Sequence, residues 1–244
     1  MKSWIWKILV AILGLLIIYV YWAGSQIGDY PEKLWLHRCN SIEKMEEQEK
    51  RFENIEVDLV YRGNGIFDVT HDADTTFGLH INPYLKEIAK DKDHMWLDIK
   101  NITDDNCQNL REDLDSLCDI YHVNKNQLII ESSNWEALGD FTRDDYYTSF
   151  YVSFEKPSHL SEEEIEVYID SLQFIADSKQ VCALSFPGWW YDEIKEELER
   201  PIDLLTWKHR TTQLEFMMTP SHFEMLEDPQ LKVILIKSKG HFHR

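Results

Sequence analysis

The sequence is poor in positive charge. It contains 25 Lys and Arg residues against 44 Asp and Glu, a formal net charge of −19 at pH 7. The first 24 residues hold two lysines and no acid, so 23 basic and 44 acidic residues remain, a net charge of −21. Such a chain repels nucleic acids and anionic surfaces, so we expect no nucleic-acid partner. An anionic substrate would need a metal ion or a local cluster of Lys and Arg.

Glycine-rich nucleotide-binding motifs are also missing, since neither a Walker sequence nor a dinucleotide fingerprint occurs. No Ser-, Gly- or Pro-rich linker and no internal repeat divides the 244 residues. This length suits one sizeable core and is short for two domains.

Cysteines are few, and their spacing does not indicate a disulfide framework. Four are present, and two of them, Cys107 and Cys118, fall on one predicted helix. Eleven residues of helix separate them by roughly 16 Å, which is beyond disulfide reach. We therefore expect free cysteines.

Only the N-terminus carries a long hydrophobic run. No charge occurs from Ile8 to Trp22, and Trp4–Trp22 is long enough to cross a bilayer if Lys7 reaches the headgroups. Aromatic residues lie near both ends of this run, where interfacial belts form. A cleaved signal peptide is the alternative, because the small residues 23–25 could mimic a cleavage site.

We favour an uncleaved anchor over residues 1–24, followed by a short linker over 25–33. Lys2 and Lys7 precede the span, so the positive-inside rule places the N-terminus in the cytoplasm. The rest of the chain would then lie outside, in a periplasmic or extracytoplasmic compartment.

After this segment the chain alternates short apolar runs with longer amphipathic stretches. The clearest helical stretch is 161–178, where Ser161 and Glu164 form a capping box. The expected strands are 34–38, 55–61, 95–100, 127–132, 149–154, 181–186, 203–208 and 232–238. Eight strands alternating with helices predict a (β/α)8 TIM-type barrel over residues 34–244. An open doubly wound sheet is the alternative, but no glycine-rich turn follows the first strand. A further short strand, 65–71, forms a hairpin with the second.

Polar residues gather where the predicted strands end, which is where barrel enzymes have their active sites. Glu56 and Asp58 share one face of the second strand, and Asp98 and Lys100 share one face of the third. The opposite faces are aliphatic and would pack on helices, so the polar sets are expected to point inward.

Three inward carboxylates cannot be buried together as bare anions, so they need a cation or protons. Glu56, Asp58 and Asp98, with no His or Cys cluster, suggest a hard ion, Mg²⁺ or Ca²⁺. The alternative is that these acids are solvated on an exposed antiparallel strand. His37 and His71, also at strand ends, suit acid–base catalysis and favour the metal site.

The segments HR (37–38), IEVDL (55–59), THD (70–72) and LDIK (97–100) together resemble the glycerophosphodiester phosphodiesterase group of the phospholipase-C-like barrel superfamily. The resemblance implies that His37 and His71 are the catalytic acid–base pair and that Glu56, Asp58 and Asp98 bind the metal. It further implies that Arg38, Lys100 and Trp207 bind the substrate.

The expected function is therefore metal-dependent hydrolysis of glycerophosphodiesters or related phospholipid or envelope phosphodiesters. The third acid is Asp98 where that group commonly has Glu, and Lys100 follows it, as in the sphingomyelinase D branch. A lyase that releases a cyclic phosphate is thus one alternative. A catalytically inactive anchored binding or scaffold barrel is another.

Two other features stay open on sequence alone. Trp189, Trp190 and Tyr191 follow the sixth strand and could either stack on a substrate or fasten the next helix to the barrel. Glu131 and Ser133 border the expected pocket by position only.

Overall fold

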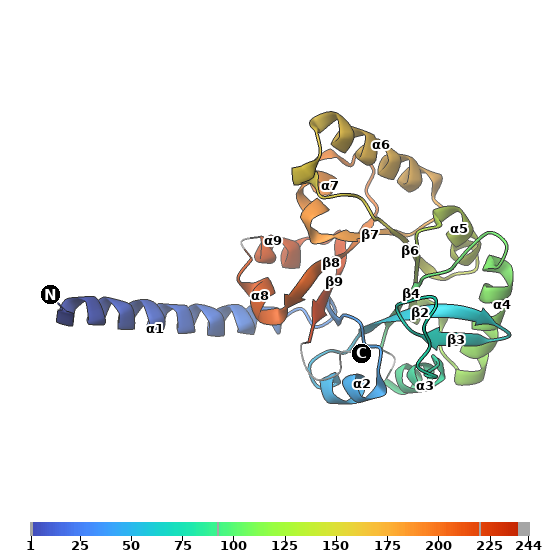
Figure 1. Ribbon diagram of the computed structural model, residues 1–244, viewed down its shortest axis with the longest axis horizontal. Coiled ribbons are helices and arrows are strands. Elements are labelled where there is room, and N and C mark those ends of the chain that lie inside the picture. Colours follow the sequence, from blue (N-terminus) through green and yellow to red (C-terminus); the bar gives the residue numbers. More distant parts are fainter. Residues whose placement is uncertain (1, 92, 220, 239–244) are drawn as a thin grey trace.

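The computed structural model describes residues 2–91, 93–219 and 221–238, so residues 239–244 of the expected barrel domain lie outside the described part. Within it, eight parallel strands close into a barrel with helices around the outside (Figure 1). The predicted TIM-type fold is confirmed.

The elements follow one another in the expected βα order. The strands are β1 (Leu34–Leu36), β2 (Ile55–Gly63), β3 (Ile66–Val69), β4 (Met95–Ile99), β5 (Leu128–Ser132), β6 (Tyr147–Tyr151), β7 (Ala183–Pro187), β8 (Asp203–Thr212) and β9 (Leu231–Lys237). The helices are α1 (Lys2–Ile27), α2 (Ile42–Gln48), α3 (Asn82–Asp91), α4 (Cys107–Tyr121), α5 (Trp135–Arg143), α6 (Glu162–Ser178), α7 (Tyr191–Glu197), α8 (Gln213–Met217) and α9 (His222–Glu227).

The barrel closes where β1 pairs with both β9 and β2, the second contact being Leu36 beside Ile55. Beyond this point β2 continues past the barrel, and the antiparallel strand β3 pairs with its extension. The hairpin therefore returns the chain to the carboxyl end of the barrel, and Thr70 donates its N–H to the carbonyl of Asp58 (3.1 Å).

Side chains alternate across the barrel wall as the sequence pattern predicts. Val57 and Leu59 of β2 belong to the large core between barrel and helices. The apolar interior is a second, smaller cluster that includes Trp35, Trp96 and Leu205. This cluster fills the inside of the barrel, and the acidic side chains lie beyond it at the carboxyl ends of the strands.

The predicted strand 149–154 is wrong in its bounds, because β6 spans Tyr147–Tyr151. Tyr147 is already paired with β5 and donates its hydroxyl to Asp203 (2.8 Å). Phe154 has left the sheet, and its ring stacks on Tyr168 of α6. An apolar residue that packs on a helix resembles a strand residue in the sequence, which explains the shift.

The helix over 161–178 is confirmed, with the capping box of Ser161 and Glu164 formed at the start of α6. Cys107 and Cys118 both lie on α4, and all four cysteines, each within the described part of the chain, are free.

Trp190 and Tyr191 fasten α7 to the barrel. Trp190 is fully buried and donates its indole N–H to the carbonyl of Glu155 (2.9 Å). Tyr191 is also buried and donates its hydroxyl to Asp228 (3.0 Å). Trp190 and Tyr191 therefore fasten the helix to the barrel and do not stack on a substrate.

Helix α1 contains a 19-residue apolar stretch, Trp4–Trp22, that is long enough to cross a membrane. It extends away from the barrel beside α8 and α9 (Figure 1). The helix continues to Ile27, so the first residues of the expected linker are helical.

Candidate active site

A cavity of about 220 Å³ opens among the carboxyl ends of the barrel strands, and it brings together all eight site residues expected from the sequence. Its lining consists of His37, Arg38, Glu56, Asp58, His71, Asp98, Lys100, Glu131, Tyr151, Trp207, Leu235 and Lys237.

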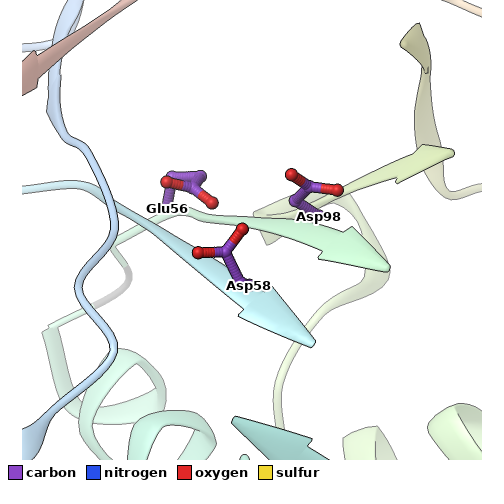
Figure 2. A group of neighbouring side chains, drawn as sticks. All are labelled: Glu56, Asp58 and Asp98. Atoms are coloured by element: carbon purple, nitrogen blue, oxygen red, sulfur yellow. The ribbon is translucent and has the colours of Figure 1, made fainter. Parts of the chain in front are cut away.

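Three carboxylates form the centre of this cavity. Glu56 and Asp58 come from the inward face of β2, and Asp98 lies beside Asp58 in the register of β2 with β4. One oxygen of each side chain lies within 4.8 Å of the others, and Figure 2 shows the three groups turned toward a common space. The sequence alternation and the parallel register together produce this arrangement.

The protein does not neutralise these acids fully. Burial raises the pKa of Glu56, only 2% exposed, well above its usual range, and the carboxylates of Asp58 and Asp98 raise it further. Burial also raises the pKa of Asp98, with Asp58 adding to the effect and with Lys100 and His71 opposing it. The site therefore favours either protons or an added cation.

Asp58 differs because cationic and hydrogen-bonding partners surround it. Burial alone would raise its pKa, but the Lys100 ammonium, 2.7 Å from Oδ1, and the Asn40 amide outweigh burial and lower it. Nδ2 of Asn40 donates to Oδ2 of Asp58 (2.7 Å). Lys100 also forms an ion pair with Asp98, and these two acids raise the pKa of Lys100 despite its burial.

The turn after β1 has an unusual backbone conformation. Arg38 has a φ of +52°, in the left-handed region that residues with a Cβ rarely adopt. Nζ of the buried Lys44 donates to the carbonyls of His37 and Arg38, both at 2.8 Å. The N–H of Arg38 donates to Oε2 of Glu56 (2.6 Å). These bonds hold the turn in place and aim Nε of Arg38 toward Asp58, at 3.8 Å.

The next residue, Cys39, is fully buried, and this burial raises the pKa of its thiol to about 12. A thiol in that state is not a nucleophile.

The two histidines flank the carboxylates. Nε2 of His37 lies 3.7 Å from Oε2 of Glu56. Burial, with Lys237 and Arg38 adding to it, lowers the pKa of His37 well below its usual range. His71 is half exposed, and its Nδ1 donates to Oδ1 of Asp72 (2.8 Å). Two imidazoles therefore border one carboxylate cluster, one buried and one open to solvent.

Sequence reasoning missed several lining or supporting residues. Asn40 is a polar residue in a loop and gives no signal by itself. Tyr151 stacks on Trp207, with ring centroids 5.0 Å apart and planes 9° apart, but β6 was displaced in the prediction. Lys237 ends β9 and carried no pattern. Tyr151 and Lys237 line the cavity and Asn40 supports it through Asp58, and all three take these places only through tertiary contacts.

The sequence predicts Glu131 and Ser133 near the pocket by position, and the structure puts Glu131 in the cavity wall, whereas Ser133 is exposed and outside the lining. Glu131 lies beside Asp98 in the register of β4 with β5 and accepts a hydrogen bond from the hydroxyl of Ser185. Burial and the charge of Asp98 raise its pKa well above its usual range. It is a fourth carboxyl at this site.

The donor set fits a hard divalent cation. All three clustered side chains offer carboxylate oxygens, which Mg²⁺ and Ca²⁺ prefer. Burial first, and the neighbouring carboxylates after it, raise the pKa values of Glu56 and Asp98, so their charged forms are disfavoured without a cation. Glu56, Asp58 and Asp98 are therefore the residues that would hold the ion.

No protein-family profile and no curated protein matches the sequence. Solved structures do match in fold. A glycerophosphodiester phosphodiesterase from Parabacteroides distasonis superposes with a TM-score of 0.57 at 16% identity, covering 84% of this chain and 92% of that one. A calcium-dependent phosphoinositol-specific phospholipase C from a Gram-negative Pseudomonas species gives a TM-score of 0.51 at 10% identity, over 83% and 87% of the two chains. The resemblance seen in the sequence is thus confirmed in the fold: this chain has the barrel of the glycerophosphodiester phosphodiesterases and of a phospholipase C.

Proposed function

We propose that this protein is a metal-dependent phosphodiester hydrolase acting on glycerophosphodiesters or related phospholipid or envelope phosphodiesters. The observation that carries the proposal is the single cavity in which all eight sequence-predicted residues meet. The enzymes named in the fold comparison act on phosphodiesters of this kind, which supports the same substrate class here.

The cations of the cavity bind the phosphate. Arg38 and Lys100 present a guanidinium and an ammonium beside the acids, and both groups bind phosphate oxygens well. The stacked rings of Tyr151 and Trp207 form an aromatic wall for the organic part of the substrate. A cavity of about 220 Å³ suits a headgroup rather than a whole lipid.

His37 and His71 move the protons. One takes the proton of the attacking hydroxyl or water, and the other gives a proton to the leaving oxygen. His71 is oriented by Asp72, which accepts from Nδ1 and leaves Nε2 for the substrate. A bound divalent cation on Glu56, Asp58 and Asp98 would supply charge stabilisation for the phosphoryl oxygens.

For the N-terminus we propose that α1 crosses the membrane once, with its first residues in the cytoplasm and the barrel outside. The apolar stretch Trp4–Trp22 supports a span, and Lys2 before it and Lys7 near its start support this orientation. The catalytic domain would then meet lipids and envelope polymers.

The test is turnover by the full-length protein in detergent, stripped of metal and then given Mg²⁺ or Ca²⁺. Substrates are a generic aryl phosphodiester, a glycerophosphodiester and a lysophospholipid. We expect metal-dependent turnover that His37→Ala abolishes and that His94→Ala, an exposed histidine outside the cavity lining, leaves intact. No turnover and no thermal stabilisation by either ion would instead support an inactive binding barrel. Phosphorus NMR of the product separates hydrolysis from release of a cyclic phosphate.

A further inference from the structure

Helix α1 contacts the barrel domain before its apolar stretch ends. The hydroxyl of Tyr19 donates to the carbonyl of Met217 at the end of α8 (3.2 Å). The ring of Trp22 packs against Phe223 of α9, with centroids 5.0 Å apart. Both contacting residues of α1 belong to Trp4–Trp22. No spacer therefore separates the apolar stretch from the domain (Figure 1).

This contact fixes the height of α8 and α9 above a membrane. Nineteen helical residues measure about 28 Å, close to the thickness of the hydrocarbon core. With Trp4–Trp22 across the bilayer, Tyr19 and Trp22 reach the interfacial layer where aromatic residues collect. Met217 and Phe223, which touch them, must then lie at the level of the lipid headgroups.

The surface beside this contact carries exposed apolar side chains among exposed acids, Glu215 of α8 and Glu224 and Glu227 of α9. Leu214 and Met218, at the two ends of the α8 segment, are each 52% exposed. Arg51 reaches the same segment and donates to the side-chain oxygen of Gln213 (2.8 Å). Exposed apolar side chains flanked by charged ones match the boundary between acyl chains and lipid headgroups.

The same segment lies at the end of the barrel that holds the catalytic cavity. Helix α8 directly follows β8, so it lies at the carboxyl end of the barrel, where the acids are. A second cavity of about 390 Å³ lies between α1 and α8, with Gly24, Leu214 and Lys237 in its wall. Lys237 also lines the catalytic cavity. The cavity between α1 and α8 and the catalytic cavity thus share Lys237 in their walls.

We infer that the α8–α9 surface formed by Leu214, Met218 and Phe223 is a second membrane-contact site, whose partner is the phospholipid surface that α1 crosses. It seats the rim of the catalytic cavity on the headgroups, so the substrate is a phosphodiester resident in that leaflet. The membrane contact stands on the anchor geometry, and the substrate class rests also on the proposed function.

The contact is tested by an environment-sensitive thiol label on full-length protein in vesicles of phosphatidylethanolamine and phosphatidylglycerol. Leu214→Cys and Met218→Cys report on the surface, and Ile120→Cys is the matched control. Ile120 is 65% exposed on α4, on the far side of the barrel (Figure 1). The unsubstituted chain gives the labelling background of its own cysteines.

We expect shorter-wavelength emission at positions 214 and 218, and quenching there by spin-labelled lipid, with neither effect at position 120. Equal emission and equal quenching at all three positions would overturn the contact. A protein partner on this surface would leave quenching by spin-labelled lipid equal at all three positions.

The link to substrate is tested by the double variant Leu214→Ser/Met218→Ser, with Ile120→Ser as its control. Turnover of a lysophospholipid in the same vesicles should fall by about tenfold, since two apolar side chains leave the lipid, while a soluble aryl phosphodiester is cleaved as before. Unchanged turnover of both substrates overturns the inference about substrate. No turnover of either by the unsubstituted protein removes the proposed function, and with it the substrate class, while the label still decides the membrane contact.

Discussion

Asn40 and Asp58 hold each other through two hydrogen bonds. Nδ2 of Asn40 donates to Oδ2 of Asp58 (2.7 Å), and the backbone N–H of Asp58 donates to Oδ1 of Asn40 (3.0 Å). The loop after β1 is thereby tied to the central acid of the cluster. The amide binds Oδ2 of Asp58, and Oδ1 is left to Lys100, 2.7 Å away.

Asn40→Ala should weaken metal binding, because partners that orient a ligand contribute about 10–100-fold to affinity. Titration of the metal-free protein with Mg²⁺ or Ca²⁺, followed by calorimetry, measures the change. Asn126→Ala, an exposed asparagine before β5, is the matched control. Equal affinity in both variants would show that Asn40 does not position a ligand.

Arg38 combines a functional side chain with a strained backbone. We expect Arg38→Ala and Arg38→Gly both to lose most turnover, since each removes the guanidinium. The glycine variant should be more stable than the alanine variant by about 1 kcal/mol, because only alanine has a Cβ that opposes a φ of +52°. Urea unfolding of the two proteins gives the comparison. Equal stability would mean that the turn relaxes once the side chain is removed.

The raised pKa of Glu131 predicts how the stability of the metal-free protein depends on pH. Its pKa in the folded protein lies above the unfolded value of about 4.3, so the folded state holds the proton more tightly. The stabilisation that Glu131 contributes is complete below its pKa in the unfolded chain. It is lost as pH rises through its pKa in the folded protein. Stability should therefore fall with rising pH over this range.

Glu131→Gln removes this titration and leaves Oε1 to accept from Ser185. Unfolding midpoints of both proteins between pH 5 and 8 should show a shallower fall for the variant. Glu136→Gln, an exposed residue of α5, controls for the loss of one negative charge. Parallel curves for wild type and Glu131→Gln would contradict the assignment.

Substitutions of His71 and Asp72 should reduce activity to different degrees. His71→Asn removes the proton carrier, so kcat should fall by about 10²–10⁴-fold with little change in stability, because the side chain is half exposed. Asp72→Asn keeps the imidazole and removes the acceptor at Nδ1, so its effect should be smaller. Steady-state kinetics with saturating metal tests the order. An Asp72 variant as impaired as the His71 variant would indicate a direct role for Asp72.

The sequence by itself determined the barrel and the set of side chains that face its open end. Strand alternation placed Glu56 and Asp58 together, and a capping box fixed the start of α6. These features depend on neighbours within a few residues, so they can be read from the chain. The bounds of β6 could not, because an apolar residue such as Phe154 packs equally well on a helix.

Only the tertiary structure decided how the site is held and where it lies. Ser185 and Glu131 are 54 residues apart, and Tyr19 and Met217 are 198 apart. The first contact forms when β5 and β7 both pair with β6, and the second forms when α1 docks on α8. Their geometry depends on strand register and helix packing, and no local pattern in the sequence encodes either one.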